Sequence, residues 1–176
     1  MREVEVKILD VDPEEIRKRL EQKGAKFLKK VFQRNILYQN SFTRKKNLTV
    51  RIREEEGKAI ITVKGPMEVK NGHKIREEKE VSTGDLEEAK KLFRAIGLEQ
   101  WAVTEAKREY YGLDNCSVEI IKIPKLPIFI EIEGSEKHIR KVAEKLGYSS
   151  DDYYAGSALD YYRELCGEDT SRLVFD

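Results

Sequence analysis

The sequence has few of the residues that cross-link, break or anchor a chain. Its 176 residues include two cysteines, four prolines and one tryptophan. Cys116 and Cys166 have neither metal-ligand nor redox spacing, which is typical of a reducing cytoplasmic compartment. We expect both to be small buried hydrophobic side chains. No stretch is long and apolar enough for a signal peptide or a membrane span, so we expect a cytoplasmic protein with no membrane partner.

The sequence also lacks a net charge. Lysine and arginine number 34 and aspartate and glutamate 33, which gives +1 at pH 7. No overall field would therefore attract nucleic acid or an anionic membrane. Charge of both signs is abundant instead, because 38% of the residues are charged and 39% are hydrophobic. This length and composition predict one globular domain over residues 1–176, with a core that needs no disulfide.

Three segments have the capping residues and apolar spacing of amphipathic helices. Each begins after a residue that accepts hydrogen bonds from backbone N–H groups and ends near a glycine. The capping residues are Asp12, Asp85 and Ser135, and the glycines are Gly24, Gly97 and Gly147. Each helix has a single apolar stripe, so we expect the three to pack against another element.

That other element is predicted to be a sheet, because most other segments alternate between charged and apolar residues. In residues 3–8, Glu3, Glu5 and Lys7 share one face of a strand and Val4, Val6 and Ile8 the other. Further strands are predicted at residues 27–32, 36–42, 48–53, 59–64, 76–80, 107–113, 118–123 and 128–133. Residues 44–47 are read as a polar turn.

The charged faces of these strands together carry six acids and six bases. They are Glu3, Glu5, Glu78, Glu80, Glu131 and Glu133, with Lys7, Arg51, Arg53, Lys64, Arg76 and Arg108. The pattern predicts an α+β fold: a closed eight-stranded antiparallel β-barrel with a polar interior and amphipathic helices packed outside. Three interpretations stay open: an internal ion-pair network, an open sheet with its charges in solvent, or a tunnel that holds a polyanion with its metal ions.

The same residues resemble the CYTH family, also called triphosphate tunnel metalloenzymes. The resemblance rests on seven pieces in order along the chain. They are Glu3-x-Glu5-x-Lys7, Gln33 with Tyr38, Arg51-x-Arg53, Thr62-x-Lys64-Gly65-Pro66, Arg76-x-Glu78-x-Glu80, Arg108-x-x-Tyr111 and Phe129-x-Glu131-x-Glu133. Near the end, Tyr162-x-Glu164-Leu165 is similar to the family's closing helix. The resemblance implies the eight-stranded tunnel fold and a single CYTH-like domain.

The resemblance also implies roles for the charged residues. Phosphoryl oxygens would be held by Lys7, Arg51, Arg53, Lys64, Arg76 and Arg108. Mg²⁺ or Mn²⁺ would be held by Glu3, Glu5, Glu78, Glu80, Glu131 and Glu133, because hard cations prefer oxygen ligands. Glu3, Glu5 and Lys7 would be catalytic. The substrate would be ATP, thiamine triphosphate or inorganic triphosphate, and the reaction either adenylyl cyclisation or triphosphate hydrolysis.

Three positions depart from the family pattern. The family usually has a lysine two residues before the arginine that matches Arg108, and this chain has Ala106 there. Lys107 beside it is expected to point outward unless a bulge turns it. The family's aspartate before the final glutamates falls at Ile121, and the glycine after it at Pro127. One phosphate ligand and one metal ligand would then be missing.

The remaining candidates are read as structural. His73 and His138 are expected on the surface, and Trp101 in a loop as a packing anchor. Tyr153-Tyr154 and Tyr161-Tyr162 suggest core packing or a homodimer contact. The basic run at residues 44–46 is expected to be solvated. Besides a metal-dependent triphosphate enzyme, two functions stay open: a nucleotide- or polyphosphate-binding protein without turnover, motivated by Ala106 and Ile121, and an RNA-contacting or structural protein.

Overall fold

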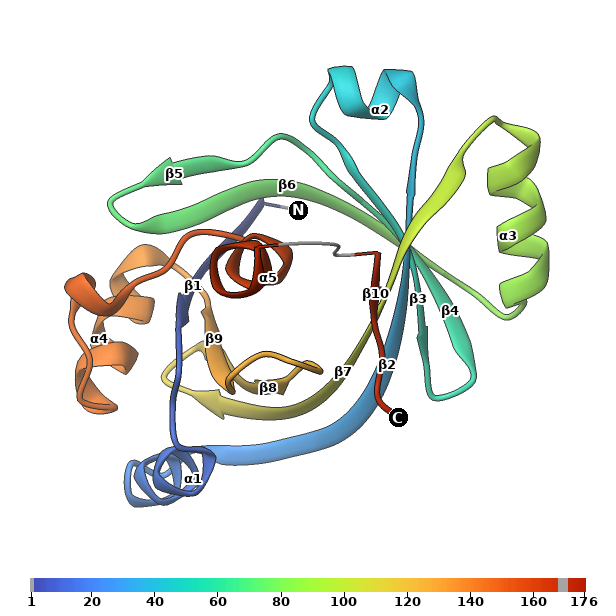
Figure 1. Ribbon diagram of the computed structural model, residues 1–176. Helices are drawn as coiled ribbons and strands as arrows, with labels where there is room; N and C mark the ends of the chain where they lie inside the picture. The colour runs from blue at the N-terminus through green and yellow to red at the C-terminus, as the bar shows by residue number, and fades with distance from the viewer. Residues whose placement is uncertain (1, 168–170) are drawn as a thin grey trace.

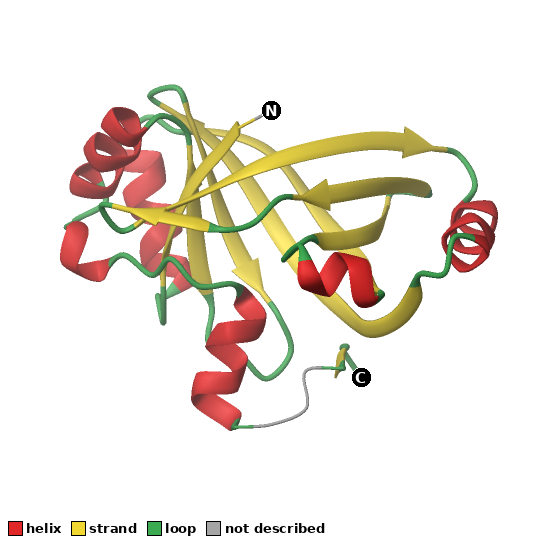
Figure 2. Cartoon of the chain, turned by 90° about the horizontal axis from the view of Figure 1, so that it is seen from above, coloured by secondary structure: helices red, strands yellow, loops and turns green. Residues whose placement is uncertain are grey.

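The chain forms a closed antiparallel barrel surrounded by helices (Figures 1 and 2). The computed structural model describes residues 2–167 and 171–176. The eight strands of the ring are β1 (Arg2–Ile8), β2 (Lys26–Gln39), β3 (Thr49–Glu55), β4 (Lys58–Lys64), β6 (His73–Thr83), β7 (Glu99–Leu113), β8 (Cys116–Lys122) and β9 (Phe129–Glu133). Two short strands pair with strands of the ring: β5 (Glu68–Lys70) with β6, and β10 (Arg172–Leu173), in parallel, with β7.

The ring closes because β1 pairs on both sides. It pairs with β9, where Glu5 lies opposite Glu133, and with β6, where Glu3 lies opposite Arg76. The other neighbours follow the order β9, β8, β7, β2, β3, β4, β6. The predicted α+β fold with a closed eight-stranded barrel is therefore confirmed.

The three predicted helices form and cover the outer face of the ring. They are α1 (Pro13–Gln22), α3 (Leu86–Ala95) and α4 (Glu136–Lys145), and their caps are the predicted Asp12, Asp85 and Ser135. The apolar stripes of α1 and α4 pack on β1, β8 and β9 in one buried cluster. Helix α3 packs on β2, β3, β4 and β7 in a second. Among the described residues, no helix is long and apolar enough to cross a membrane.

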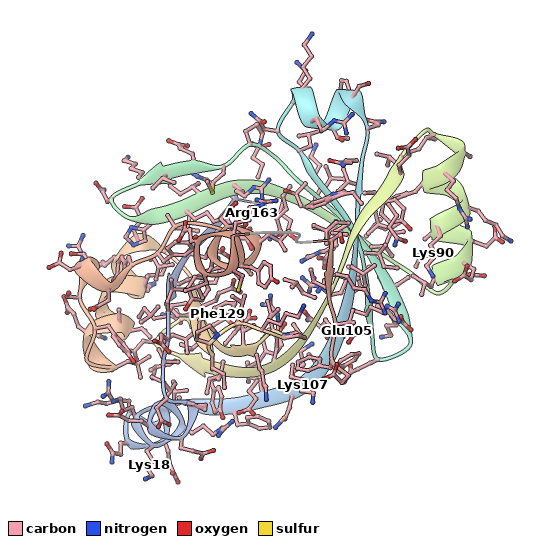
Figure 3. All side chains as sticks on the ribbon, viewed as in Figure 1. Lys18, Lys90, Glu105, Lys107, Phe129 and Arg163 are labelled. Carbon is pink, nitrogen blue, oxygen red and sulfur yellow. The ribbon has the colours of Figure 1, made fainter. Side chains whose placement is uncertain are left out.

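A third apolar cluster lies on the inner face, at one end of the barrel. It joins Ala106, Ile121 and Phe129 of the strands to Tyr161 and Tyr162 of α5 (Ala158–Cys166). In Figure 1 the ribbon of α5 lies across the opening of the ring, and in Figure 3 the labelled Phe129 lies just beneath it. The barrel interior is therefore polar over only part of its length.

Several local predictions were wrong. Of the run read as a turn, residues 44 and 45 belong to a short helix, α2 (Ser41–Lys45), and residues 46 and 47 form the turn; β2 is one long strand. Trp101 lies within β7 and not in a loop. His73 is only 1% exposed; it hydrogen-bonds the carbonyl of Asn71 at 2.9 Å and packs against Tyr153. Cys116 is buried as predicted, whereas Cys166 is exposed.

Candidate functional site

The inner face of the ring encloses a cavity of about 880 Å³. Strand alternation turns every second residue of each strand toward it. All twelve charged residues singled out in the sequence line this cavity: Glu3, Glu5, Lys7, Arg51, Arg53, Lys64, Arg76, Glu78, Glu80, Arg108, Glu131 and Glu133. The barrel therefore brings together side chains from six of its strands, β1, β3, β4, β6, β7 and β9.

One group of charges is centred on β1. The Lys7 ammonium lies 2.7 Å from Glu5 and 3.1 Å from Glu131, and Lys74 lies 2.8 Å from Glu5. All four residues are buried or nearly so. Burial raises the pKa of Glu5, but the ammonium groups of Lys7 and Lys74 outweigh it and hold that pKa well below its ordinary value. Lys74 was not among the predicted site residues.

A second group joins β1, β4 and β6. Lys64 lies 2.8 Å from Glu3 and 3.1 Å from Glu78. Burial, and then the charge of Glu5, raise the pKa of Glu3. Arg76 is held by the backbone, because its Nε donates to the carbonyl of Gly65 at 2.7 Å. These basic groups are positioned by the barrel itself.

Arg108 forms the third group, with a carboxylate that the sequence reading missed. Its Nη1 donates to Glu131 at 2.8 Å and also to Glu119 of β8. Glu119 lies opposite Glu131 in the strand register, lines the cavity, and is 8% exposed. Ile121, where the family aspartate was aligned, belongs to the apolar cluster under α5. Strand β8 therefore does supply an acid to the lumen, two residues before the position at which the family aspartate was aligned.

Arg51 and Arg53 of β3 differ from the other bases. Within residues 2–167 and 171–176, neither has a carboxylate within ion-pair distance, and the Nε of each is buried without a hydrogen-bond partner. Arg51 makes one hydrogen bond, from Nη2 to the hydroxyl of Thr62 at 3.3 Å. Burial, and then the charges of Arg53 and Arg108, lower the pKa of Arg51 to about 9. Two half-buried guanidinium groups, each with a buried Nε, thus face the cavity without a carboxylate at ion-pair distance in the described residues.

Glu133 is the complementary case among the acids. It lies directly opposite Glu5 across the β1–β9 pair, where like charges are destabilising. Burial, and then Glu3, Glu119 and Glu5, raise its pKa to about 7. A cation near this carboxylate would relieve that repulsion.

The lumen fits a hard divalent cation by the chemistry of its donors, because carboxylate oxygens are the ligands such ions prefer. Glu3, Glu5 and Glu133 come from the adjacent strands β1 and β9. In the described part of the chain, however, no three acidic, histidine or cysteine side chains are already gathered around one point. Glu3 and Glu5 already form ion pairs with lysines. A cation would have to displace Lys64 from Glu3, and Lys7 and Lys74 from Glu5.

Two further cavity residues were missed because nothing in the linear pattern marks them. Asn35 of β2 lies between Arg53 and Thr104 in register and is 6% exposed. Trp101 reaches the cavity wall through an irregularity in β7. Lys107 is exposed, as predicted, and its ammonium lies 4.5 Å from the Phe175 ring centroid.

A closed antiparallel barrel with a buried lumen of opposed carboxylates, lysines and arginines defines a class of protein with a charged tunnel. Comparison with known proteins gives the family. The model of the CYTH domain matches residues 1–157, so this chain belongs to the CYTH family.

Individual relatives resemble the chain over most of its length. A protein of Methanocaldococcus jannaschii named "Putative adenylate cyclase MJ0240" is 32% identical over 151 residues, which are 83% of this chain and 86% of that protein. The structure of the PH1012 protein from Pyrococcus horikoshii OT3 superposes with a TM-score of 0.77 at 28% identity, covering 88% of this chain and 96% of that one. A conserved hypothetical protein of Pyrococcus furiosus has the same fold, with a TM-score of 0.77 at 23% identity, covering 90% and 98%.

Proposed function

We propose that this chain is a divalent-metal-dependent enzyme that acts on a triphosphate substrate held in the barrel lumen. The observation that carries the proposal is the pair Arg51 and Arg53, half-buried guanidinium groups with buried Nε atoms that face the cavity without a carboxylate partner in the described residues. A buried, unpaired charge is costly, so a protein retains it where a ligand supplies the counter-charge. Guanidinium forks match phosphoryl oxygens in bidentate geometry.

The remaining bases would extend this cradle. Lys7, Lys64, Arg76 and Arg108 line the same cavity, and most are fixed by a carboxylate or a backbone carbonyl. A chain of phosphates could therefore contact several rigidly placed donors at once, which is the positioning that phosphoryl transfer needs.

The acids would hold Mg²⁺ or Mn²⁺, with Glu3, Glu5 and Glu133 on the adjacent strands β1 and β9 and with Glu78, Glu80, Glu119 and Glu131 lining the same cavity. Such an ion, when bound, neutralises phosphoryl charge and orients the attacking and leaving oxygens. The lysines now paired with these acids would then be released toward the phosphates. Lys7, between Glu5 and Glu131, is placed to make that exchange.

Two reactions fit this arrangement. In cyclisation, the 3′-hydroxyl of ATP attacks the α-phosphorus, loses its proton, and pyrophosphate leaves. In hydrolysis, water attacks the terminal phosphorus, the bond to the bridging oxygen breaks so that the diphosphate part leaves, and orthophosphate forms. The name of the M. jannaschii relative supports cyclisation. Fold likeness alone is a weak guide to the reaction type, so the products decide.

One incubation tests the proposal and separates the alternatives. The protein is mixed with ATP or inorganic triphosphate, with Mg²⁺ or Mn²⁺, and cyclic AMP, pyrophosphate and orthophosphate are followed; a chelator provides the metal-free control. Cyclic AMP with pyrophosphate identifies a cyclase, and orthophosphate without cyclic AMP a triphosphatase. Tight binding without product would instead identify a binding protein, and RNA binding that excess triphosphate does not displace would overturn the proposal.

A further inference from the structure

One end of the cavity differs in chemistry from the phosphate cradle. Its lining includes Leu37 of β2, Leu48, Trp101 of β7 and Arg44 of α2. We call Leu37, Leu48 and Trp101 the apolar wall. Leu37 lies beside Arg51 in register, so the apolar wall begins directly next to the arginine pair. None of these residues belongs to the predicted set of phosphate or metal ligands.

Trp101 reaches this wall through a break in the strand register. Leu37 pairs with Ala102, but the next residue of β2, Tyr38, pairs with Gln100, so Trp101 is an extra residue on β7. Inward residues of β7 are otherwise the even-numbered ones, such as Thr104 and Arg108. A bulge of this kind redirects a side chain, and here it places an odd-numbered aromatic residue on the cavity wall.

The position of Trp101 relative to the cradle follows from the register. It is the unpaired residue opposite the Leu37–Tyr38 step of β2, and Leu37 lies beside Arg51, which places Trp101 and Arg51 two strands apart, about 10 Å at the spacing of neighbouring strands. Trp101 is half-buried, and no ring contact within the described residues involves its indole. A flat aromatic group attached to a triphosphate would therefore meet an indole ring that is open to the cavity.

A polar group lies on β2 two residues before Leu37. Asn35 is flanked by Arg53 on one side and Thr104 on the other, and its Oδ1 is buried without a hydrogen-bond partner in the described structure. A buried amide oxygen without a partner is costly, and a ligand donor would satisfy it. Inorganic triphosphate offers no apolar face and no N–H donor of its own, whereas a nucleoside such as adenosine offers both.

We infer that the cavity has a subsite for an aromatic heterocycle, with Trp101 as the stacking platform and Asn35 as the hydrogen-bond partner of the nucleoside. The natural substrate is then an organic triphosphate such as a nucleotide, and not inorganic triphosphate. This inference rests on the proposed function, because the triphosphate must lie in the arginine cradle to bring its base to Trp101.

The wild-type chain can report on this directly, since Trp101 is its one tryptophan. ATP and inorganic triphosphate are titrated with Mg²⁺ while indole fluorescence is recorded, and calorimetry measures binding of each. We expect both ligands to bind and ATP alone to quench the fluorescence, because only adenine can stack on the indole. Identical fluorescence responses to both bound ligands would overturn the subsite.

Substitution provides the second test. Trp101→Ala should weaken ATP binding by about tenfold or more while leaving the affinity for inorganic triphosphate within about twofold. Trp101→Phe should keep most of the ATP affinity, and Phe32→Ala, which removes an exposed aromatic residue outside the cavity, should change neither ligand.

The outcomes separate the two claims. Equal effects of Trp101→Ala on both ligands, or no effect on either, would overturn the subsite and leave the proposal of a triphosphate site unchanged. If the wild-type protein binds neither ligand, the proposed function fails and the subsite with it. Melting temperatures of the variants show whether a loss of binding reflects a loss of fold.

Discussion

The two faces of the same eight strands have opposite chemistry. The outward face carries residues such as Val6, Ile120 and Ile132, which are buried under α1 and α4. The inward face carries the charged residues of the cavity, among them the unpaired Arg51 and Arg53. Burial of apolar surface stabilises a fold, whereas burial of charge generally costs free energy. The outer face therefore holds the barrel together, and the inner face has the arrangement of a ligand site at the expense of stability.

The largest effect should come from the outer face. Ile132 is fully buried, so Ile132→Ala should lower the free energy of unfolding by about 2–5 kcal/mol through lost burial and a cavity. Denaturant titration measures the change, and Val81→Ala, at an exposed position, is the matched control with an expected change of about 0.5 kcal/mol or less. Triphosphate affinity at a temperature where the variant is folded should not change. If affinity fell as far as stability, the two faces would not be separable.

The inner face should show the reverse. Arg53→Ala should weaken triphosphate binding by about 2–3 kcal/mol, roughly 30- to 150-fold, because a charged donor to phosphate is lost. The same variant should melt at a higher temperature than the wild type without ligand, since a half-buried charge whose buried Nε has no hydrogen-bond partner is removed. Calorimetry and thermal melts measure the two quantities. Arg34→Ala, an exposed arginine on β2, is the control and should change neither.

The smallest effect should depend on pH. The pKa of Glu133 is raised from 4.5 to about 7, so its charged form destabilises the folded state, and stability is lost as pH rises through this range. Glu133→Gln should therefore stabilise the metal-free protein at about pH 8 and have little effect near pH 4. Because the side chain is partly solvated, we expect a gain of about 1 kcal/mol.

Melts in a chelator at both pH values check this expectation. Adding Mg²⁺ or Mn²⁺ should remove most of the advantage of Glu133→Gln, because a bound cation would neutralise the wild-type carboxylate. A variant that is less stable than the wild type at the higher pH would show that Glu133 is already compensated within the barrel.

The sequence predicted the barrel and most of its lumen because strand alternation is a local signal. Glu3, Glu5 and Lys7 share a face whichever strands lie beside them. Glu119 escaped notice because apolar, β-branched neighbours surround it, and its role appears only when β8 pairs with β9 opposite Glu131. Trp101 depends on a register shift, which no single strand reveals.

Ala106 and Ile121 show a second limit. Compared with the family pattern they are missing ligands, but in the fold they pack with Phe129 and the tyrosines of α5. The contact between residues near position 121 and a helix near position 161 is tertiary, so the sequence could not distinguish a lost ligand from a packing site. His73 was misplaced for the same reason, since Tyr153 covers it.

Because β1 pairs with β6 on one side and β9 on the other, the strand that opens the sequence is the seam of the ring. Pairing strands that lie so far apart along the chain is entropically costly and slow, so β1 should pair with β6 and β9 late in folding. It also carries Glu3, Glu5 and Lys7, so a molecule in which β1 has not yet paired on both sides has no complete ligand site. A ligand that binds those side chains would bind only the closed ring, and it would stabilise the closed ring to a degree set by its affinity and concentration.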